Sequence, residues 1–165
     1  MKTLLPLAIL GLAACTQPKS AEAPQLPGAD ATAEAVMEAD RAFNEMARAQ
    51  GEQAAFMEYM DQVDGKLFRP GNIVQGRDGI EADFADWPDD ADLIWSPLGA
   101  HGAASGDLGV TWGEYRVERG GDKIGGGHYV TAWRKNSDGD WKGVIDLGVS
   151  EPPPPAEAEQ TDTTE

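Results

Sequence analysis

The chain has 165 residues, of which 41% are hydrophobic, enough for one domain with a core and too few for two such domains. Its 29 acidic and 13 basic residues give a formal charge of −16. A chain this acidic repels a phosphate backbone, so we expect no nucleic-acid partner. The only cysteine is Cys15, which excludes an intrachain disulfide and leaves stability to packing.

The N-terminal segment MKTLLPLAILGLAACT has the layout of a secretory signal peptide, with the basic Lys2, a short apolar run and small residues before a cysteine. The run is shorter than the roughly 20 apolar residues that a membrane-spanning helix requires. Residues 12–15, LAAC, resemble the lipobox of bacterial lipoprotein precursors. The resemblance implies removal of residues 1–14 and acylation of Cys15, with palmitate among the acyl groups. The alternative is an ordinary signal peptide followed by a free thiol.

A lipid on Cys15 predicts a location in the cell envelope. Each buried acyl CH₂ contributes about 0.8 kcal/mol, so more than one acyl chain makes a durable anchor. Thr16, rather than Asp, follows the cysteine, and by resemblance to enterobacterial sorting this implies an outer membrane, with the protein facing the periplasm. We expect the membrane to be a partner only through this lipid.

Two polar segments flank the predicted domain, which covers residues 33–149. Residues 15–32 are rich in Pro, Ala and polar residues and show no apolar period, so they are typical of a flexible tether. Residues 150–165 contain four consecutive prolines and five carboxylates without a large apolar residue. This composition predicts a disordered acidic tail, and a partner-binding segment is the alternative.

Three helical patterns come first in the domain. Apolar residues recur at helical spacing between Val36 and Ala47, with Asp30 or Thr32 available as the N-cap and Gly51 as the stop. Aromatic and aliphatic residues mark the two shorter patterns, and we expect them in the core. The second pattern carries Phe56 and Met60, and the third carries Ile80, Phe84 and Trp87 before Pro88.

Strand patterns follow, each bounded by Gly, Asp or Asn. They are KLFRP at 66–70, DLIWSPLGA at 92–100, DLGVTWGEYRVER at 107–119 and the hairpin GHYVTAWRKNSDGDWKGVID at 127–146. The glycine-rich run at 120–127 is interpreted as a flexible hairpin connection. Helices first and a meander of strands afterwards predict an α+β domain with an antiparallel sheet.

Four phrases, ADRAFNEMA, LFRPG, SGDLGVTWGEY and the hairpin from Gly127 to Asp146, resemble the nuclear-transport-factor-2-like superfamily, in particular its SnoaL-like and ketosteroid-isomerase-like members of unknown function. The resemblance covers nearly all of residues 34–148. It implies a curved antiparallel sheet wrapped over N-terminal helices, a cone-shaped, cystatin-like roll with a pocket. Many members pair through the outer face of the sheet, so a homodimer is expected.

The superfamily supports many functions on one scaffold, so the fold does not name an activity. Ketosteroid isomerases require an aspartate base facing a tyrosine and a protonated aspartate. The tyrosines of this chain are Tyr59, Tyr115 and Tyr129, and none lies in a context that matches that motif. The isomerase activity is therefore not carried over.

Aromatic residues on the predicted strands are the candidates for contact with a ligand. The resemblance places such residues around the cone, which would accept a small hydrophobic or amphipathic molecule. A role in the core is the alternative for each of them. The candidates are Phe68, Trp95, Trp112, Tyr115 and Tyr129.

His128 and Asp146 are the candidate acid/base pair. Pairing Lys135 with Trp141 leaves a five-residue turn, places Val130 opposite Asp146, and makes His128 a same-face diagonal neighbour of Asp146. If that face lines the open end of the cone, Asp146 would orient His128 as a general acid/base; otherwise the pair is structural. One face of this hairpin is then expected to carry Tyr129, Thr131, Trp133, Trp141, Ile145 and Leu147.

Neither a metal nor a cofactor is expected. His101 and His128 are far apart in sequence, and the turn at 136–140 lacks the glycine and glutamate that an EF-hand loop requires. The chain also has no nucleophile motif. The first hypothesis is a lipid-anchored domain that binds a small apolar ligand. The alternatives are a cofactor-independent isomerase or dehydratase of the same fold and a non-catalytic structural or oligomerisation module.

Overall fold

The computed structural model describes residues 28–152, which form three helices and a six-stranded sheet. The helices are α1 (Ala29–Gln50), α2 (Glu52–Tyr59) and α3 (Gly76–Phe84). The strands are β1 (Lys66–Arg69), β2 (Asn72–Gln75), β3 (Ala91–Gly102), β4 (Leu108–Arg119), β5 (Asp122–Lys135) and β6 (Trp141–Ser150). The predicted α+β class, with a curved sheet over the N-terminal helices, is confirmed.

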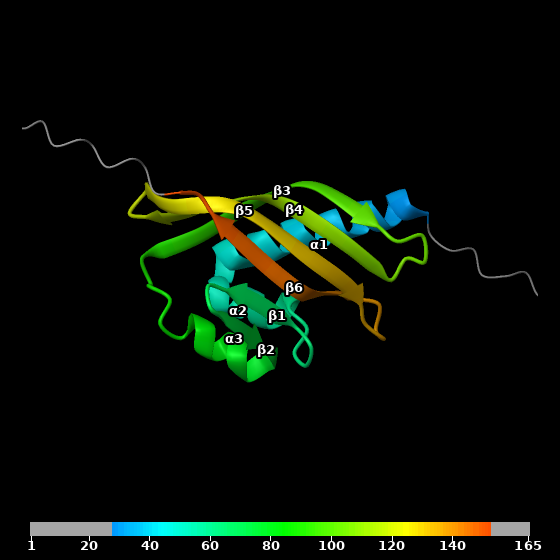
Figure 1. Ribbon diagram of the computed structural model, residues 1–165, viewed down its shortest axis with the longest axis horizontal. Helices are drawn as coiled ribbons and strands as arrows, with labels where there is room; N and C mark the ends of the chain where they lie inside the picture. The colour runs from blue at the N-terminus through cyan, green and yellow to red at the C-terminus, as the bar shows by residue number, and fades with distance from the viewer. Residues whose placement is uncertain (1–27, 153–165) are drawn as a thin grey trace, which may run out of the picture.

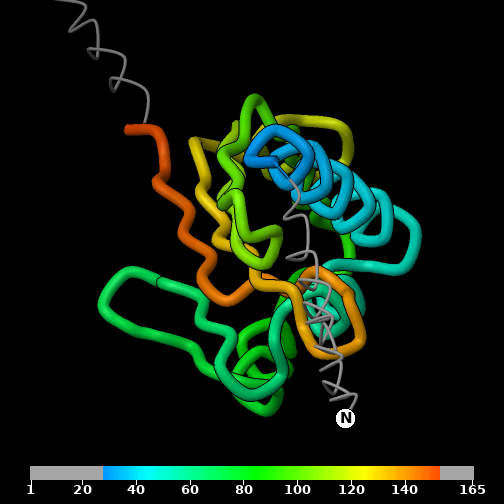
Figure 2. Tube along the Cα trace, turned by 90° about the vertical axis from the view of Figure 1, so that its right-hand side faces the viewer, coloured from blue at the N-terminus to red at the C-terminus, as the bar shows by residue number. Residues whose placement is uncertain are grey.

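The strands lie in the order β2-β1-β6-β5-β4-β3. Neighbouring strands are antiparallel except β1 and β6, which pair in parallel. In Figure 1, α1 runs behind strands β3 to β5, while α2, α3 and the short β1–β2 hairpin gather below them. Figure 2 shows the same arrangement from the side. One face of the long strands is thus covered by α1, and the other face is left open.

Helix α1 begins at Ala29, within the segment 15–32 that was predicted as a tether. Its N-cap is Gly28, without a side-chain hydrogen bond, so the proposed caps Asp30 and Thr32 are corrected. Thr32 is instead buried against the sheet. The predicted stop is confirmed, because Gly51 takes a φ of 91° and ends the helix.

The segments that connect the main helices and strands contain more strand structure than was predicted. Strand β2 was not expected, and it pairs with β1 along its whole length. The glycine-rich run is a turn only at Gly120 and Gly121, which have φ values of 60° and 92°. Residues 122–127 belong to β5, since backbone hydrogen bonds to β4 need no side chains. The predicted turn at 136–140 joins β5 to β6.

The core is aromatic and lies between the helices and the sheet. The ring of Phe43 on α1 lies 4.8 Å from that of Phe56 on α2 and 4.7 Å from that of Trp95 on β3. Trp133 on β5 is 0% exposed, and its indole N–H donates to Thr111. Edge-on aromatic contacts of this kind add to the free energy of apolar burial.

The hairpin register is correct at its turn and wrong beyond it. Lys135 pairs with Trp141 as predicted, but a bulge between Ala132 and Trp133 shifts the remaining pairs by one residue. Thr131 therefore lies opposite Asp146, and Val130 opposite Leu147. Asp146 turns to the inner face as a result. Ile145 and Leu147, which were predicted beside Tyr129, lie on the outer face.

Contacts with the residues that follow α2 accompany the bulge. The backbone N–H of Asp61 donates to the carbonyl of Gly143, and a Cβ on Gly143 would lie 2.6 Å from the sulfur of Met60. Gly143 is thus held against the end of α2 while the rest of β6 follows β5. A bulge absorbs the extra residue. The alternation of polar and apolar residues within the hairpin could not predict this contact with a distant part of the chain.

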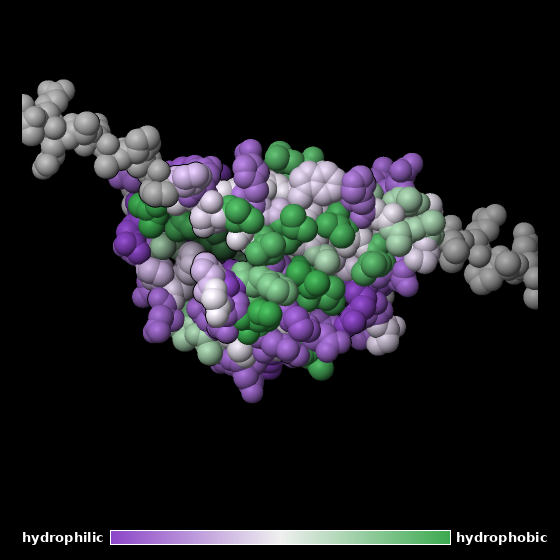
Figure 3. All heavy atoms as spheres, in the orientation of Figure 1, coloured by the Kyte–Doolittle hydropathy of each residue, from purple (hydrophilic) through white to green (hydrophobic). Residues whose placement is uncertain are grey.

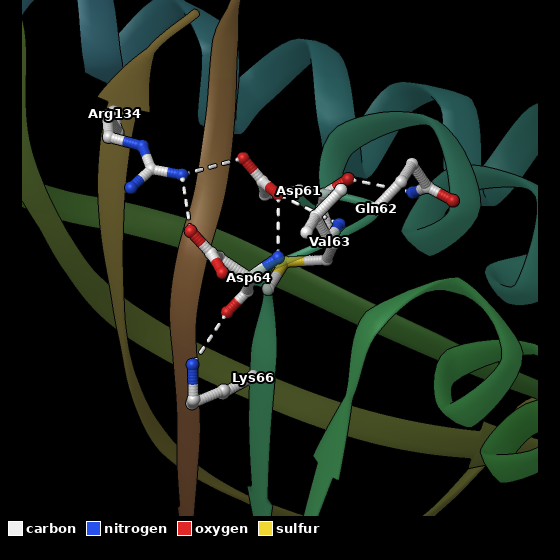
Figure 4. A network of polar contacts seen from close by, with 7 residues as sticks. Asp61, Gln62, Val63, Asp64, Lys66 and Arg134 are labelled. Atoms are coloured by element: carbon white, nitrogen blue, oxygen red, sulfur yellow. Dashed lines mark hydrogen bonds and ion pairs between the residues drawn. The ribbon is translucent and has the colours of Figure 1, made fainter.

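A polar network joins β5 to the loop between α2 and β1 (Figure 4). Arg134 donates to Asp61 at 2.9 Å and to Asp64 at 3.3 Å. Asp61 also accepts the backbone N–H groups of Val63 and Asp64. These bonds hold the pKa of Asp61 below its ordinary value, although burial opposes the shift. The network fixes the loop that precedes β1.

Candidate functional site

A cavity of about 400 Å³ lies between the inner face of the sheet and the helices. This volume falls within the range of roughly 300–1,000 Å³ that is typical of small-molecule sites. Its walls are mainly aromatic and aliphatic. They are formed by Phe43, Phe56, Phe68, Pro70, Phe84, Trp87, Leu93, Trp95, Tyr115, Val117, Tyr129 and Gly148, with Arg69, Asp83, Thr131, Asp146 and Ser150 as polar members.

The structure brings four of the five predicted aromatic residues to this cavity: Phe68, Trp95, Tyr115 and Tyr129. Trp112 does not line it. Strand residues alternate between faces, and Thr111 points inward, so Trp112 lies on the outer face, where its ring is 4.9 Å from that of His101. The proposed ligand contact at Trp112 is therefore corrected.

The predicted pair of His128 and Asp146 is not formed. His128 lies opposite Val149 on the outer face, with 69% of its side chain exposed and Nε2 3.9 Å from a carboxylate oxygen of Glu114. Asp146 lies opposite Thr131 on the inner face. The bulge in the hairpin separates the two residues, because a shift by one residue exchanges the faces of a strand.

Asp146 is a buried acidic residue in the cavity wall. It is 9% exposed, and one of its oxygens, Oδ2, accepts a hydrogen bond of 2.8 Å from the hydroxyl of Thr131. No described residue donates to Oδ1, yet within residues 28–152 no fully buried side-chain polar atom lacks a partner. Oδ1 is therefore open to the cavity that Asp146 lines.

Burial raises the pKa of Asp146 to about 6. The hydrogen bond from Thr131 and the positive charge of Arg69 oppose this shift, whereas the negative charge of Asp40 adds to it. A carboxyl group in this position changes its charge near neutral pH. Sequence analysis identified Asp146 as a titratable candidate but assigned it the wrong neighbours.

Asp40 on α1 lies beneath the cavity wall and is 0% exposed. Its Oδ1 accepts the indole N–H of Trp95 at 2.8 Å, and its Oδ2 accepts the hydroxyl of Tyr129 at 2.9 Å. Burial raises the pKa of Asp40, and these hydrogen bonds oppose the shift. Burial and the charge of Asp40 also raise the pKa of Tyr129, so its hydroxyl keeps its proton.

Sequence reasoning did not single out Asp40, although a signal was present. Asp40 stands at helical spacing between Val36 and Phe43, within the apolar stripe of the first helix. A charged residue on a buried stripe needs hydrogen-bond donors from the facing element. Which strand residues would supply them is decided only by the tertiary structure.

An ion pair between Arg69 on β1 and Asp83 on α3 forms another part of the wall. Nε and Nη2 of Arg69 lie 3.0 Å and 2.8 Å from Oδ2 of Asp83. The guanidinium also lies 5.6 Å from the ring centre of Phe84, close enough for a cation–π contact. Neither residue was predicted as part of a site, because the chain brings them together only through the fold.

The described residues offer neither a grouped set of metal ligands nor a membrane-spanning helix. Within residues 28–152, no three His, Cys, Asp or Glu side chains are grouped so that they could hold a metal ion. None of the helices in this range is long and apolar enough to cross a membrane. Cys15 lies outside the described residues, as do the predicted signal peptide and most of the tether and tail.

The arrangement of a curved sheet, covering helices and an internal cavity defines an α+β cone. No protein-family model matches the sequence, and the comparison with curated proteins gives no match. Solved structures do match, however. An NTF-2-like protein of unknown function from Shewanella oneidensis is 19% identical, with a TM-score of 0.57, and the match covers 69% of this chain and 95% of that one.

Two further solved structures have the same architecture. A ketosteroid isomerase-like protein from Erwinia carotovora is 17% identical, with a TM-score of 0.58 over 72% of this chain and 96% of that one. A Mycobacterium tuberculosis protein in complex with estradiol-17β-hemisuccinate is 17% identical, with a TM-score of 0.53 over 70% and 92%. These similarities show that the fold is the cystatin-like, nuclear-transport-factor-2-like cone.

Proposed function

We propose that this protein is a lipid-anchored cell-envelope protein whose cone domain binds a small, largely apolar molecule. The observation that supports this most directly is the aromatic cavity of about 400 Å³, whose wall includes a carboxylate oxygen of Asp146 that receives no hydrogen bond from the described part of the chain. Burial of apolar ligand surface contributes about 25 cal/mol per Å², and a few polar groups fix the orientation.

Proteins with a similar fold support a ligand of this size. The Mycobacterium tuberculosis protein described above is bound to a steroid ester, and a computationally designed protein that is 16% identical binds 17-OHP. Rings stack well on aromatic walls such as those of Phe56, Phe84 and Trp95. We infer that the ligand of this cavity is a rigid ring compound.

The anchor is proposed from the sequence alone. Cys15 follows a short apolar run and two small residues, the order that acylation requires, and about a dozen polar and small residues separate it from Gly28. Such a tether keeps a small domain clear of the lipid headgroups. The proposed location is the periplasmic face of the outer membrane.

A homodimer is proposed through the open face of the sheet. Four apolar residues from β5 and β6 gather there, and we call them the outer apolar patch: Val130, Ile145, Leu147 and Val149. Figure 3 shows apolar side chains in the middle of this face. An exposed apolar patch rimmed by polar residues is typical of a protein interface.

Leu147→Lys tests the proposed dimer and is expected to give a monomer in sedimentation velocity. An unchanged sedimentation coefficient would show that the outer apolar patch is not part of the interface.

Ligand binding is tested with 4-methoxybiphenyl, a neutral ring compound small enough for the cavity. Gly148 lies on the inner face and lines the cavity, so Gly148→Leu would fill part of it. The neighbouring Val149 points outward, and Val149→Leu is the matched control. We expect calorimetry to show binding to the wild type and to Val149→Leu, and at least about tenfold weaker binding to Gly148→Leu. Equal affinities would place the ligand outside the cavity.

A second function is favoured by one observation. Asp146 combines an oxygen open to the cavity with a pKa raised by burial to about 6, which suits a general acid or base near neutral pH. The enzyme would then be a cofactor-independent isomerase or dehydratase. A compound that is extracted from the native protein and converted by the wild type, but only bound by Asp146→Asn, would support this alternative over simple binding.

A further inference from the structure

We propose that the cavity selects neutral or cationic ring compounds that carry a hydrogen-bond donor, such as a hydroxyl or amino group, for Oδ1 of Asp146, and that it rejects carboxylates. This inference rests on the proposed binding function and makes it more specific. It follows from which polar groups of the wall are already used and which are free.

Three donor side chains that line the cavity already donate within the protein. The indole N–H of Trp95 and the hydroxyl of Tyr129 both donate to Asp40, behind the wall. The hydroxyl of Thr131 donates to Oδ2 of Asp146. A ligand carbonyl or ether would therefore find no free donor among these side chains. Oδ1 of Asp146, in contrast, accepts no hydrogen bond from any residue in the described range 28–152.

Asp146 as a residue is only 9% exposed, and no described residue donates to its Oδ1. Leaving a buried polar group without a hydrogen bond costs about 1–3 kcal/mol, and more for a charged group. A ligand that covers Oδ1 of Asp146 without donating to it would incur this cost, whereas a ligand hydroxyl or ammonium that donates to Oδ1 avoids it. Hydrogen bonds to a charged acceptor are stronger than those between neutral groups.

The charges that face Asp146 disfavour an anion. Arg69 on β1 is the one positive group of the lining, and it is paired with Asp83 on α3 at 2.8 Å. Asp40 on α1 lies behind the wall and adds negative charge, while Thr131 and Tyr129 on β5 are neutral. The described groups around Asp146 therefore sum to a negative charge. This negative charge would repel a ligand carboxylate.

Three probes of nearly the same shape separate these possibilities: 4-phenylphenol, 4-methoxybiphenyl and biphenyl-4-carboxylate. The first carries a donor, the second only an acceptor, and the third a negative charge. At pH 7.5, we expect the wild type to bind the phenol about tenfold more tightly than the ether, the low end for a hydrogen bond to a charged group. The carboxylate should bind most weakly of the three.

Asp146→Asn provides the matched variant, since it keeps the shape and removes the charge. We expect the preference for the phenol over the ether to shrink to less than about threefold. In the wild type, the preference should also fall between pH 7.5 and pH 5, as Asp146 becomes protonated. Near-ultraviolet circular dichroism of the variant confirms that it is folded, and the comparison of probes on the wild type needs no variant.

The outcomes are distinct. If the ether binds as tightly as the phenol, Asp146 does not select a donor and the inference is overturned. If the carboxylate binds most tightly, Arg69 leaves Asp83 and the site is an anion site instead. If none of the three probes binds, the proposed binding function for ring compounds fails together with the inference.

Discussion

Asp40 on α1 and Tyr129 on β5 are joined by a hydrogen bond of 2.9 Å that lies wholly inside the protein. The same carboxylate accepts the indole N–H of Trp95 on β3. One residue of the helix thus fastens two strands of the sheet at the base of the cavity. The bond also leaves Tyr129 without a hydroxyl proton to offer to a ligand, although its ring lines the wall.

Tyr129→Phe tests how much the hydrogen bond between Tyr129 and Asp40 stabilises the protein. The substitution removes one of the donors to a fully buried carboxylate, so the free energy of unfolding is expected to fall by about 1–3 kcal/mol. Urea denaturation followed by fluorescence measures the change. Tyr115→Phe is the control, because its hydroxyl meets Ser150 at the exposed rim, and a change below about 0.5 kcal/mol is expected there. Equal effects of the two substitutions would contradict the role assigned to Asp40.

Asp146 should make stability depend on pH. Its pKa is about 6 in the folded protein and has an ordinary value of 3.8, so the folded state binds the proton more tightly than the unfolded chain. The free energy of unfolding should therefore fall as the pH rises from about 4 to about 6, by roughly 2–3 kcal/mol from this group.

Asp146→Asn removes that contribution, while groups that do not interact with Asp146 titrate equally in both proteins. The variant should gain stability relative to the wild type as the pH rises through the same window, and the difference should then stay constant above it. Urea denaturation at half-unit pH steps measures both curves. A difference that does not vary with pH would mean that Asp146 titrates as in an unfolded chain.

Trp133 is expected to contribute more to stability than any residue at the rim. It is 0% exposed, and its indole N–H bonds to Thr111. Trp133→Ala should lower the free energy of unfolding by about 3–5 kcal/mol. Trp141→Ala is the comparison, since this ring is only half-buried and contacts Lys135, and its loss should cost less than half as much. A melting temperature unchanged by Trp133→Ala would remove this residue from the core.

Cys15→Ala tests the proposed anchor. Without the thiol no acyl chain is attached, and the described domain contains no helix that could replace the anchor. We expect the protein to move from the membrane fraction to the soluble fraction, as seen by immunoblotting after a salt wash. Thr16→Ala is the matched control and should stay with the membrane. A Cys15→Ala protein that remained in the membrane fraction would exclude the lipid as the anchor.

The sequence by itself determined the class of fold, because its signals are local. Apolar residues at helical spacing before Gly51, and alternating strands bounded by glycine and aspartate, are readable over short windows. Lys135 pairs with Trp141 as predicted because the length of the turn fixes the nearest pair. The same local pattern placed Phe68, Trp95, Tyr115 and Tyr129 on strands that line the cavity.

The tertiary structure alone decided which polar groups meet. The contact of Gly143 with Met60, the C-cap of α2, accompanies the bulge that carries Asp146 inward and leaves His128 outside, and no feature of the hairpin encodes this contact. Asp40 and Tyr129 are 89 residues apart in the chain and meet because α1 crosses the sheet. Faces of a strand exchange with a shift of one residue. Long-range packing therefore decided which of the candidate residues lie together at the cavity, whereas the sequence could only identify them as candidates.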